Sequence, residues 1–149
     1  MADDRQPRWI AAVDARHARL LRCVPTRTGW RIEEVGELQN QWEDDHEHGR
    51  PTVLGHGPAT APPHLVAPGG QQAESLRRFA RDVSAWLASH APARDGELVI
   101  LAPPRFLGAL RPHLDLHRPV LQIEREVAHL RAAELAAHPA VTEILERPA

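Results

Sequence analysis

Three runs of apolar or alternating residues occupy the first forty positions of the chain. Residues 9–13 form a short apolar run, residues 18–24 partly alternate, and residues 30–38 alternate again. Apolar runs and period-two alternation are typical of β-strands. The polar or proline-containing segments 14–16 and 25–29 separate them as turns. These short connections predict an antiparallel three-stranded meander.

A long amphipathic helix is the clearest element of the sequence. Its apolar residues recur at intervals of three and four, which places them on one face of a helix. They are Leu76, Phe79, Ala80, Val83, Trp86 and Leu87. Arg77, Arg78 and Arg81 fall on the opposite face. The pattern predicts a helix that ends near His90, before Pro92.

Two further apolar segments alternate with helical sequence in the last third. Residues 97–102 are almost continuously apolar, as in a strand buried on both faces, and residues 120–123 predict a fifth strand. Two prolines open a predicted helix over residues 103–114, because proline suits the first helical turn. Helical sequence then continues to about Arg147, with a break near Pro139.

The predicted order of elements is β-β-β-α-β-α-β-α. Three antiparallel strands lead into right-handed crossovers, so that helices pack on a mixed five-stranded sheet. We therefore expect one α/β domain over residues 1–149. This layout is similar to that of ribonuclease-H-like folds and of related domains in translation proteins. A fold does not determine a function, so the candidate sites are considered separately.

Residues 40–70 have no periodic apolar signal and are predicted to form a long mobile loop within the domain. Loops of this length tend to be functional or disordered. The loop carries a cluster of carboxylates and imidazoles, which are ligands for zinc or manganese. These are Asp44, Asp45, His46, Glu47, His48, His56 and His64. They match no helix-spaced metal motif, so we interpret them as a solvated loop and predict no metal site.

The composition restricts the setting. The chain has 149 residues, 42% of them hydrophobic, which is enough for one domain with a proper core. The single cysteine, Cys23, excludes an internal disulfide and fits a reducing compartment. No apolar run has membrane-spanning length, and the N-terminus lacks the regions of a signal peptide. We expect a soluble, cytoplasmic protein with no membrane partner and no cofactor.

Arginine is the only strongly basic residue type in the chain. All 18 basic residues are arginine, and the formal net charge is −2. A GC-rich genome explains this bias without any function. Arginine nevertheless suits phosphate binding and base stacking better than lysine does. Whether RNA is a partner therefore depends on whether the arginines cluster locally.

Gly69-Gly70-Gln71, directly before the long helix, is the most informative motif. Two glycines let the backbone approach a ligand closely, and the glutamine offers a donor and an acceptor that never ionise. A helix N-terminus also attracts phosphates and developing oxyanions. The alternative is a Gly-Gly hinge that closes a long loop.

The motif and its helix resemble the middle domain of archaeal and eukaryotic class I peptide-chain release factors. The resemblance lies in Gly69-Gly70-Gln71 followed by a helix that contains Arg78-Phe79-Ala80-Arg81. In that family the glutamine enters the peptidyl-transferase centre and helps water to hydrolyse the peptidyl-tRNA ester. The resemblance implies catalytic roles for Gly69, Gly70 and Gln71.

A second resemblance covers nearly the whole chain. Residues 13–20, 78–81 and 101–111 resemble the bacterial family often labelled host attachment protein, and Ala102-Pro103-Pro104-Arg105 with Leu107-Gly108-Ala109-Leu110-Arg111 is its most specific stretch. That family is regarded as bacterial kin of the archaeo-eukaryotic release factors. Arg105 and Arg111 follow a predicted central strand, where α/β folds often place ligands, and can contact RNA phosphates. Alternatively, they are surface residues of a proline-started helix.

For two other candidate catalytic residues, Asp14 and Cys23, we favour a structural role. Asp14 sits where ribonuclease-H-like enzymes carry a magnesium-binding carboxylate, but such catalysis needs several converging carboxylates. The later strands offer only Glu97, Glu124 and Glu126 near their ends, so Asp14 is interpreted as a turn residue. Cys23 is interpreted as an ordinary buried strand cysteine.

The sequence thus predicts a release-factor-like protein that acts at the ribosome on peptidyl-tRNA. Gln71 is expected to position the attacking water, and Arg77, Arg78, Arg81, Arg105 and Arg111 to bind RNA. No codon-reading domain is expected in 149 residues, so release is predicted to be codon-independent, as in ribosome rescue. The alternative is a non-catalytic module that binds RNA, the ribosome or a protein. A third reading is a metal-dependent hydrolase that uses the histidine-rich loop.

Overall fold

The computed structural model describes residues 5–42, 68–92, 94, 96–114 and 118–147. These residues form one α/β domain with a mixed five-stranded sheet in the order β3-β2-β1-β4-β5. The strands are β1 (Arg8–Val13), β2 (His17–Thr26), β3 (Gly29–Gln39), β4 (Glu97–Ala102) and β5 (Val120–Glu124). The helices are α4 (Pro68–His90), α5 (Pro104–Leu110), the 3-10 helix η2 (Arg111–His113), α6 (Ala132–Ala136) and α7 (Pro139–Glu146).

Strands β1, β4 and β5 run parallel, and β2 and β3 complete an antiparallel meander on the other side of β1. Ala11 pairs with Ile100 across β1 and β4, and Ile100 pairs with Gln122 across β4 and β5. Consequently the carboxyl ends of the three parallel strands meet at one edge of the sheet. We call this the carboxyl edge; β1 ends there at Val13, β4 at Ala102 and β5 at Glu124.

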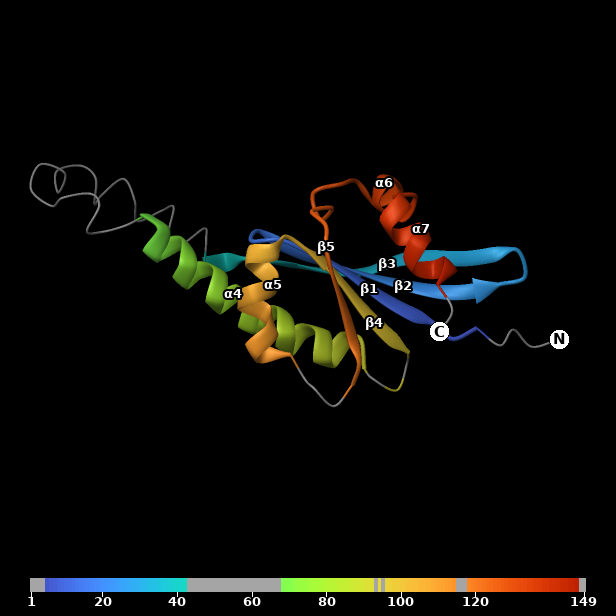
Figure 1. Cartoon of the computed structure of the whole chain (residues 1–149), viewed down its shortest axis with the longest axis horizontal. Coiled ribbons are helices and arrows are strands. Elements are labelled where there is room, and N and C mark those ends of the chain that lie inside the picture. Colours follow the sequence, from blue (N-terminus) through green and yellow to red (C-terminus); the bar gives the residue numbers. More distant parts are fainter. Residues whose placement is uncertain (1–4, 43–67, 93, 95, 115–117, 148–149) are drawn as a thin grey trace, which may run out of the picture.

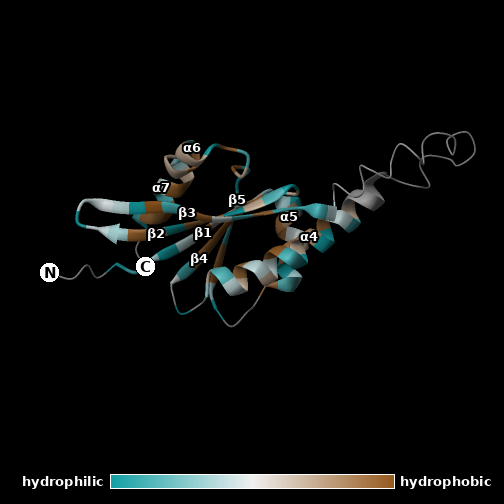
Figure 2. Cartoon of the chain, turned by 180° about the vertical axis from the view of Figure 1, so that it is seen from behind, coloured by the Kyte–Doolittle hydropathy of each residue, from teal (hydrophilic) through white to brown (hydrophobic). Residues whose placement is uncertain are grey.

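Helices cover both faces of the sheet. α4 and α5 pack on one face, and α6 and α7 pack on the other (Figure 1). Figure 2 shows hydrophobic residues, in brown, on the central strands and on parts of the helices. The buried apolar side chains come from these strands and helices. On the α4 face, the rings of Phe79 and Phe106 meet edge to face with centroids 5.9 Å apart. This contact joins α4 to α5 above the sheet.

Two buried arginines fasten the α6–α7 layer to the strands. Arg8 of β1 donates to the backbone oxygens of Ile144 and Arg147 at the end of α7, and its guanidinium lies 5.5 Å from the centroid of the Trp30 ring. Cations are favourable at a helix C-terminus, where carbonyl groups lack helical partners. Arg8 therefore ends α7 and attaches it to the first strand.

Arg19 of β2 attaches the segment that follows β5 to the sheet. Its Nε and Nη2 atoms lie 3.1 Å and 2.6 Å from the two carboxylate oxygens of Glu34, in a bidentate pair. Its Nη1 donates to the backbone oxygens of Ala128 and Leu130. The bond to Glu34 also raises the pKa of Arg19 against the opposing effect of burial. Every arginine contact here is charge-assisted, and such bonds are the stronger ones.

The predicted five-stranded mixed sheet and its order of elements are confirmed, with corrections at several boundaries. Proline 25 does not end the second strand, because β2 continues to Thr26 and Pro25 pairs with Trp30. The helix predicted over residues 103–114 is shorter, because α5 ends at Leu110 and residues 111–113 form the 3-10 helix η2. The predicted break near Pro139 is confirmed, because Pro139 opens α7 and the His138 ring caps its backbone. Helical structure after β5 begins only at Ala132, later than predicted.

Both ends of the segment 40–70, which is predicted to be a loop, are ordered parts of the domain. Asn40 is buried, and α4 already begins at Pro68. Residues 43–67, which include all the candidate metal ligands of this loop, lie outside the described residues. The prediction of a mobile loop therefore stays a prediction for that segment.

The contact between α4 and α5 generates a stability prediction. Phe79→Ala is expected to lower the free energy of unfolding by about 3–5 kcal/mol, because it removes a fully buried ring and leaves a cavity under the helix. Urea denaturation monitored by circular dichroism measures this change. Arg81→Ala, two residues along on the exposed face of the same helix, is the control and should stay within about 0.5 kcal/mol of the wild type. Equal losses for both variants would contradict the packing described.

Candidate functional site

Helix α4 reaches beyond the sheet that it covers. Its 23 residues correspond to a length of about 34 Å, whereas β1 and β4 have six residues each. Figure 1 shows the N-terminal end of α4 extending past the carboxyl edge, away from the other helices. The first turns of α4 are consequently held by fewer elements than its apolar second half.

Asn40 anchors α4 where it crosses the carboxyl edge. Its side-chain amide lies 2.8 Å from the backbone oxygen of Ala15 and 3.1 Å from the hydroxyl of Ser75, and its backbone N–H donates to Arg16. The indole N–H of Trp42 donates to Asp82 at 2.8 Å. The chain that leaves β3 is therefore attached to α4 at two points.

Gly69-Gly70-Gln71 lies within the first turn of α4. The prediction that this tripeptide precedes the helix is wrong, because α4 begins at Pro68. Proline is well suited to the first helical turn, where its missing N–H costs no hydrogen bond, and it starts the helix upstream of the glycines. The tripeptide is thus located at the end of α4 that extends past the carboxyl edge, beside N–H groups that have no partner within a helix.

The three arginines of α4 lie on its exposed side, as predicted. Arg77 and Arg78 both bond to Glu74, with Nη2 of Arg77 2.7 Å from Oε2 and Nε of Arg78 2.9 Å from Oε1. These two bonds hold the pKa of the Glu74 carboxyl below its usual value. Arg78 also stacks on the Trp42 ring at 4.8 Å. The side chain of Arg81 forms no ion pair or hydrogen bond with the residues that the structure describes.

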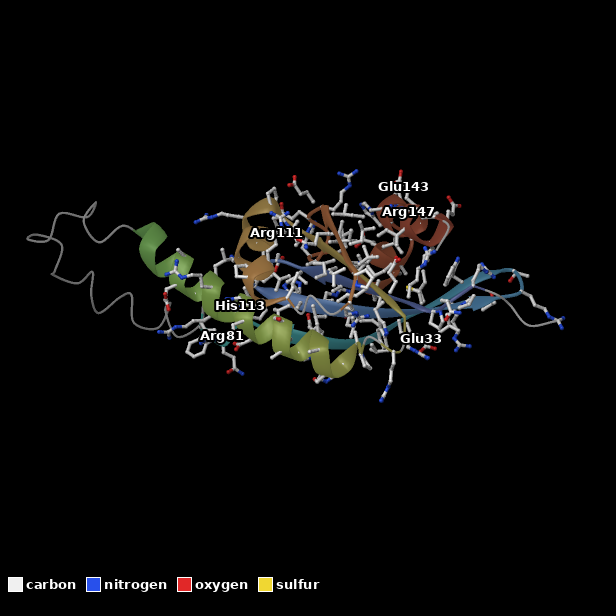
Figure 3. The ribbon with its side chains drawn as sticks, turned by 60° about the horizontal axis from the view of Figure 1, so that its bottom comes forward. Glu33, Arg81, Arg111, His113, Glu143 and Arg147 are labelled. Atoms are coloured by element: carbon white, nitrogen blue, oxygen red, sulfur yellow. The ribbon has the colours of Figure 1, made fainter. Side chains whose placement is uncertain are left out.

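Arg105 and Arg111 lie on the same face of the sheet as α4 but on other elements. Pro103 has extended geometry and Pro104 opens α5, so the predicted proline start of this helix is confirmed. Arg105 is exposed near the carboxyl edge, and Nε of Arg111 donates to the side-chain oxygen of Gln122 at 2.7 Å. Figure 3 shows Arg81 of α4 and His113 of η2 on one side of the molecule.

Asp14 is a turn residue, as the sequence analysis favours. Its carboxylate accepts the backbone N–H groups of Arg16 and His17 at 2.8 Å and 2.9 Å. Glu124 ends β5 at the carboxyl edge, whereas Glu97 starts β4 at the opposite edge. Within the described part of the chain, no group of three or more acidic, histidine or cysteine side chains is arranged to hold a metal ion.

Three residues that shape the surroundings of the α4 arginines were not predicted from the sequence. They are Asn40, Trp42 and Glu74. Glu74 had a usable signal, because it stands three and four residues before Arg77 and Arg78, the spacing at which helical side chains meet. Asn40 and Trp42 had none, since they lie beyond the last alternating strand residue and contact α4 only through the tertiary fold.

A family model described as "Protein required for attachment to host cells" matches residues 9–138. The chain belongs to this family. The match includes β1 from its second residue, the other four strands, α4, α5 and α6, and therefore every element around the carboxyl edge. The description of this attachment family names a biological requirement and no chemical activity. The comparison with curated proteins finds no match.

Of the helices that the structure describes, none has both the length and the apolar character needed to cross a membrane.

Cys23 is buried in β2, which confirms its structural interpretation. Burial raises the pKa of its thiol to about 12, partly offset by the charge of Arg8. The folded state therefore favours the neutral thiol, and this stabilisation is complete below pH 9 and is lost as the pH rises from about 9 to about 12.

This linkage gives a pH-dependent prediction. The free energy of unfolding of the wild type should decrease relative to that of Cys23→Ala when the pH is raised from 7 to 10.5, because only the wild type has a thiol to ionise on unfolding. Urea titrations of both proteins at the two pH values measure the difference. A constant difference would show that the thiol is already ionisable in the folded protein.

Proposed function

We propose that this protein is release-factor-like and acts at the ribosome on peptidyl-tRNA, without dependence on a codon. The observation that carries the proposal is the position of Gly69-Gly70-Gln71 at the end of α4 that extends past the carboxyl edge. Gln71 positions water for attack on the ester, and the glycines allow close approach of the backbone. The ribosome supplies the remaining surroundings of the reaction, in the cytoplasm.

The exposed arginines of α4 support an RNA partner. Arg77, Arg78 and Arg81 lie within about one helical turn of one another on the exposed side, so an RNA backbone can run along the helix towards its N-terminal end. Arg105 of α5 and Arg111 of η2 are exposed on the same face of the sheet as α4. Guanidinium groups pair with phosphates in a bidentate geometry that suits this task.

A substitution at Gln71 tests the hydrolytic part of the proposal. Gln71→Ala should slow the release of a labelled peptide from stalled ribosome complexes by about 100-fold, because it removes a positioned hydrogen-bonding group. Gln72→Ala is the matched control, since it removes the same type of side chain one position later in the sequence. Equal release by the wild type and Gln71→Ala would remove Gln71 from the mechanism.

The RNA contact is tested by salt dependence. Arg81→Gln should make the slope of log affinity against log salt for a fluorescent single-stranded RNA shallower by about 0.7, the loss of one phosphate contact. Arg147→Gln removes the same charge after α7, on the other face of the sheet (Figure 3), and should leave the slope unchanged. An unchanged slope for Arg81→Gln would argue against RNA binding along α4.

The second candidate function is a non-catalytic RNA- or ribosome-binding module of the host attachment family. The observation that favours it is the helical first turn of α4, where residues 69–71 form part of a helix and not a loop. RNA binding that weakens with salt, combined with no peptide release by any variant, would select this candidate.

A further inference from the structure

Glu74 occupies the space between two arginines on the exposed side of α4. Each oxygen of its carboxylate is bonded to a different guanidinium, Oε2 to Arg77 at 2.7 Å and Oε1 to Arg78 at 2.9 Å. Arginine side chains recognise a phosphate group in a similar way, by donating hydrogen bonds to two of its oxygens. The carboxylate thus fills a position that suits an RNA phosphate.

The three side chains are open to an incoming ligand. Arg77 is 61% exposed, Arg78 45% and Glu74 47%. Salt bridges at such positions contribute little free energy, so a competing anion can replace the carboxylate at low cost. The stacking of Arg78 on Trp42 keeps its guanidinium in place when the carboxylate leaves.

We propose that Glu74 is a built-in competitor for RNA phosphate, which holds Arg77 and Arg78 until an RNA strand displaces it. This inference rests on the proposed RNA contact along α4 and adds its regulation. With Glu74 in place, the four side chains at positions 74, 77, 78 and 81 carry a net charge of +2, from three arginines and one carboxylate. Displacement exposes all three positive charges to the strand.

The arrangement favours a strand with consecutive phosphates over a single phosphate group. Arg81 makes no ion pair with any described residue and stands one turn beyond Arg77, with Cβ atoms about 5–6 Å apart. A first phosphate that binds Arg81 raises the local concentration of the next phosphate beside Glu74. An isolated phosphate lacks this assistance and must compete with the carboxylate directly.

The experiment measures binding of a fluorescent single-stranded RNA by anisotropy. Glu74→Gln should bind about five-fold more tightly than the wild type, the scale of one exposed ion pair. It should also show a salt slope steeper by about 0.7, for one additional phosphate contact. Adding Arg78→Gln to this variant should abolish the gain, because the freed guanidinium provides it. Inorganic phosphate should compete poorly with the RNA on the wild type and better on Glu74→Gln.

Glu143→Gln is the matched control, because it removes the same charge from an exposed site on α7, across the sheet from α4 (Figure 3). Its RNA affinity should equal that of the wild type. Equal affinities for Glu74→Gln and the wild type, or an equal gain in Glu143→Gln, would overturn the inference.

Peptide release is measured separately on the same variants. Tighter RNA binding by Glu74→Gln without release by any variant would refute the hydrolytic function alone. Release by the wild type with no effect of Glu74→Gln on RNA affinity would refute the competitor role alone.

Discussion

The architecture depends on the two-sided burial of the central strands β1 and β4. From Trp9 to Val13 every side chain is apolar and buried, and the same is true from Leu98 to Ala102. Such strands must be covered on both faces to remove their apolar surface from water. This single requirement places α4 and α5 on one face and α6 and α7 on the other. It also explains why the parallel strands are joined by helices.

The two helical layers are attached to the sheet in different ways. α4 and α5 are held by apolar contacts, with Phe79 and Phe106 at their junction. The opposite layer has short helices and relies additionally on the guanidinium groups of Arg8 and Arg19, which bond to backbone oxygens beyond the strands. An arginine can satisfy several carbonyls at once, so two side chains secure a segment that has little helical structure of its own.

The proposed activity depends on a difference in packing between the two ends of α4. Its second half is fixed by the core, whereas its first turns extend past the carboxyl edge and carry the glycine-glycine-glutamine motif. The arginines follow in the middle of the helix, on its exposed side. Asn40 and Trp42 hold the helix at the crossing point, so the direction in which it extends is set by the domain itself. Glu74 forms ion pairs with two of the arginines of α4. In the role proposed for it, a phosphate must displace the Glu74 carboxylate before it can bind these two guanidinium groups.

Local pattern by itself determined the strands, the amphipathic face of α4, the proline start of α5, the helix break near Pro139, and the turn role of Asp14. Each of these depends on neighbours within about four residues, where periodicity and backbone restriction act. The exposed arginines were predictable for the same reason. Tertiary structure alone decided that Asn40 bridges a turn and a helix, that Arg8 and Arg19 are buried among distant carbonyls, and that Trp42 stacks on Arg78. These contacts join segments far apart in sequence, and only the packing of both sheet faces brings them within hydrogen-bonding or stacking distance.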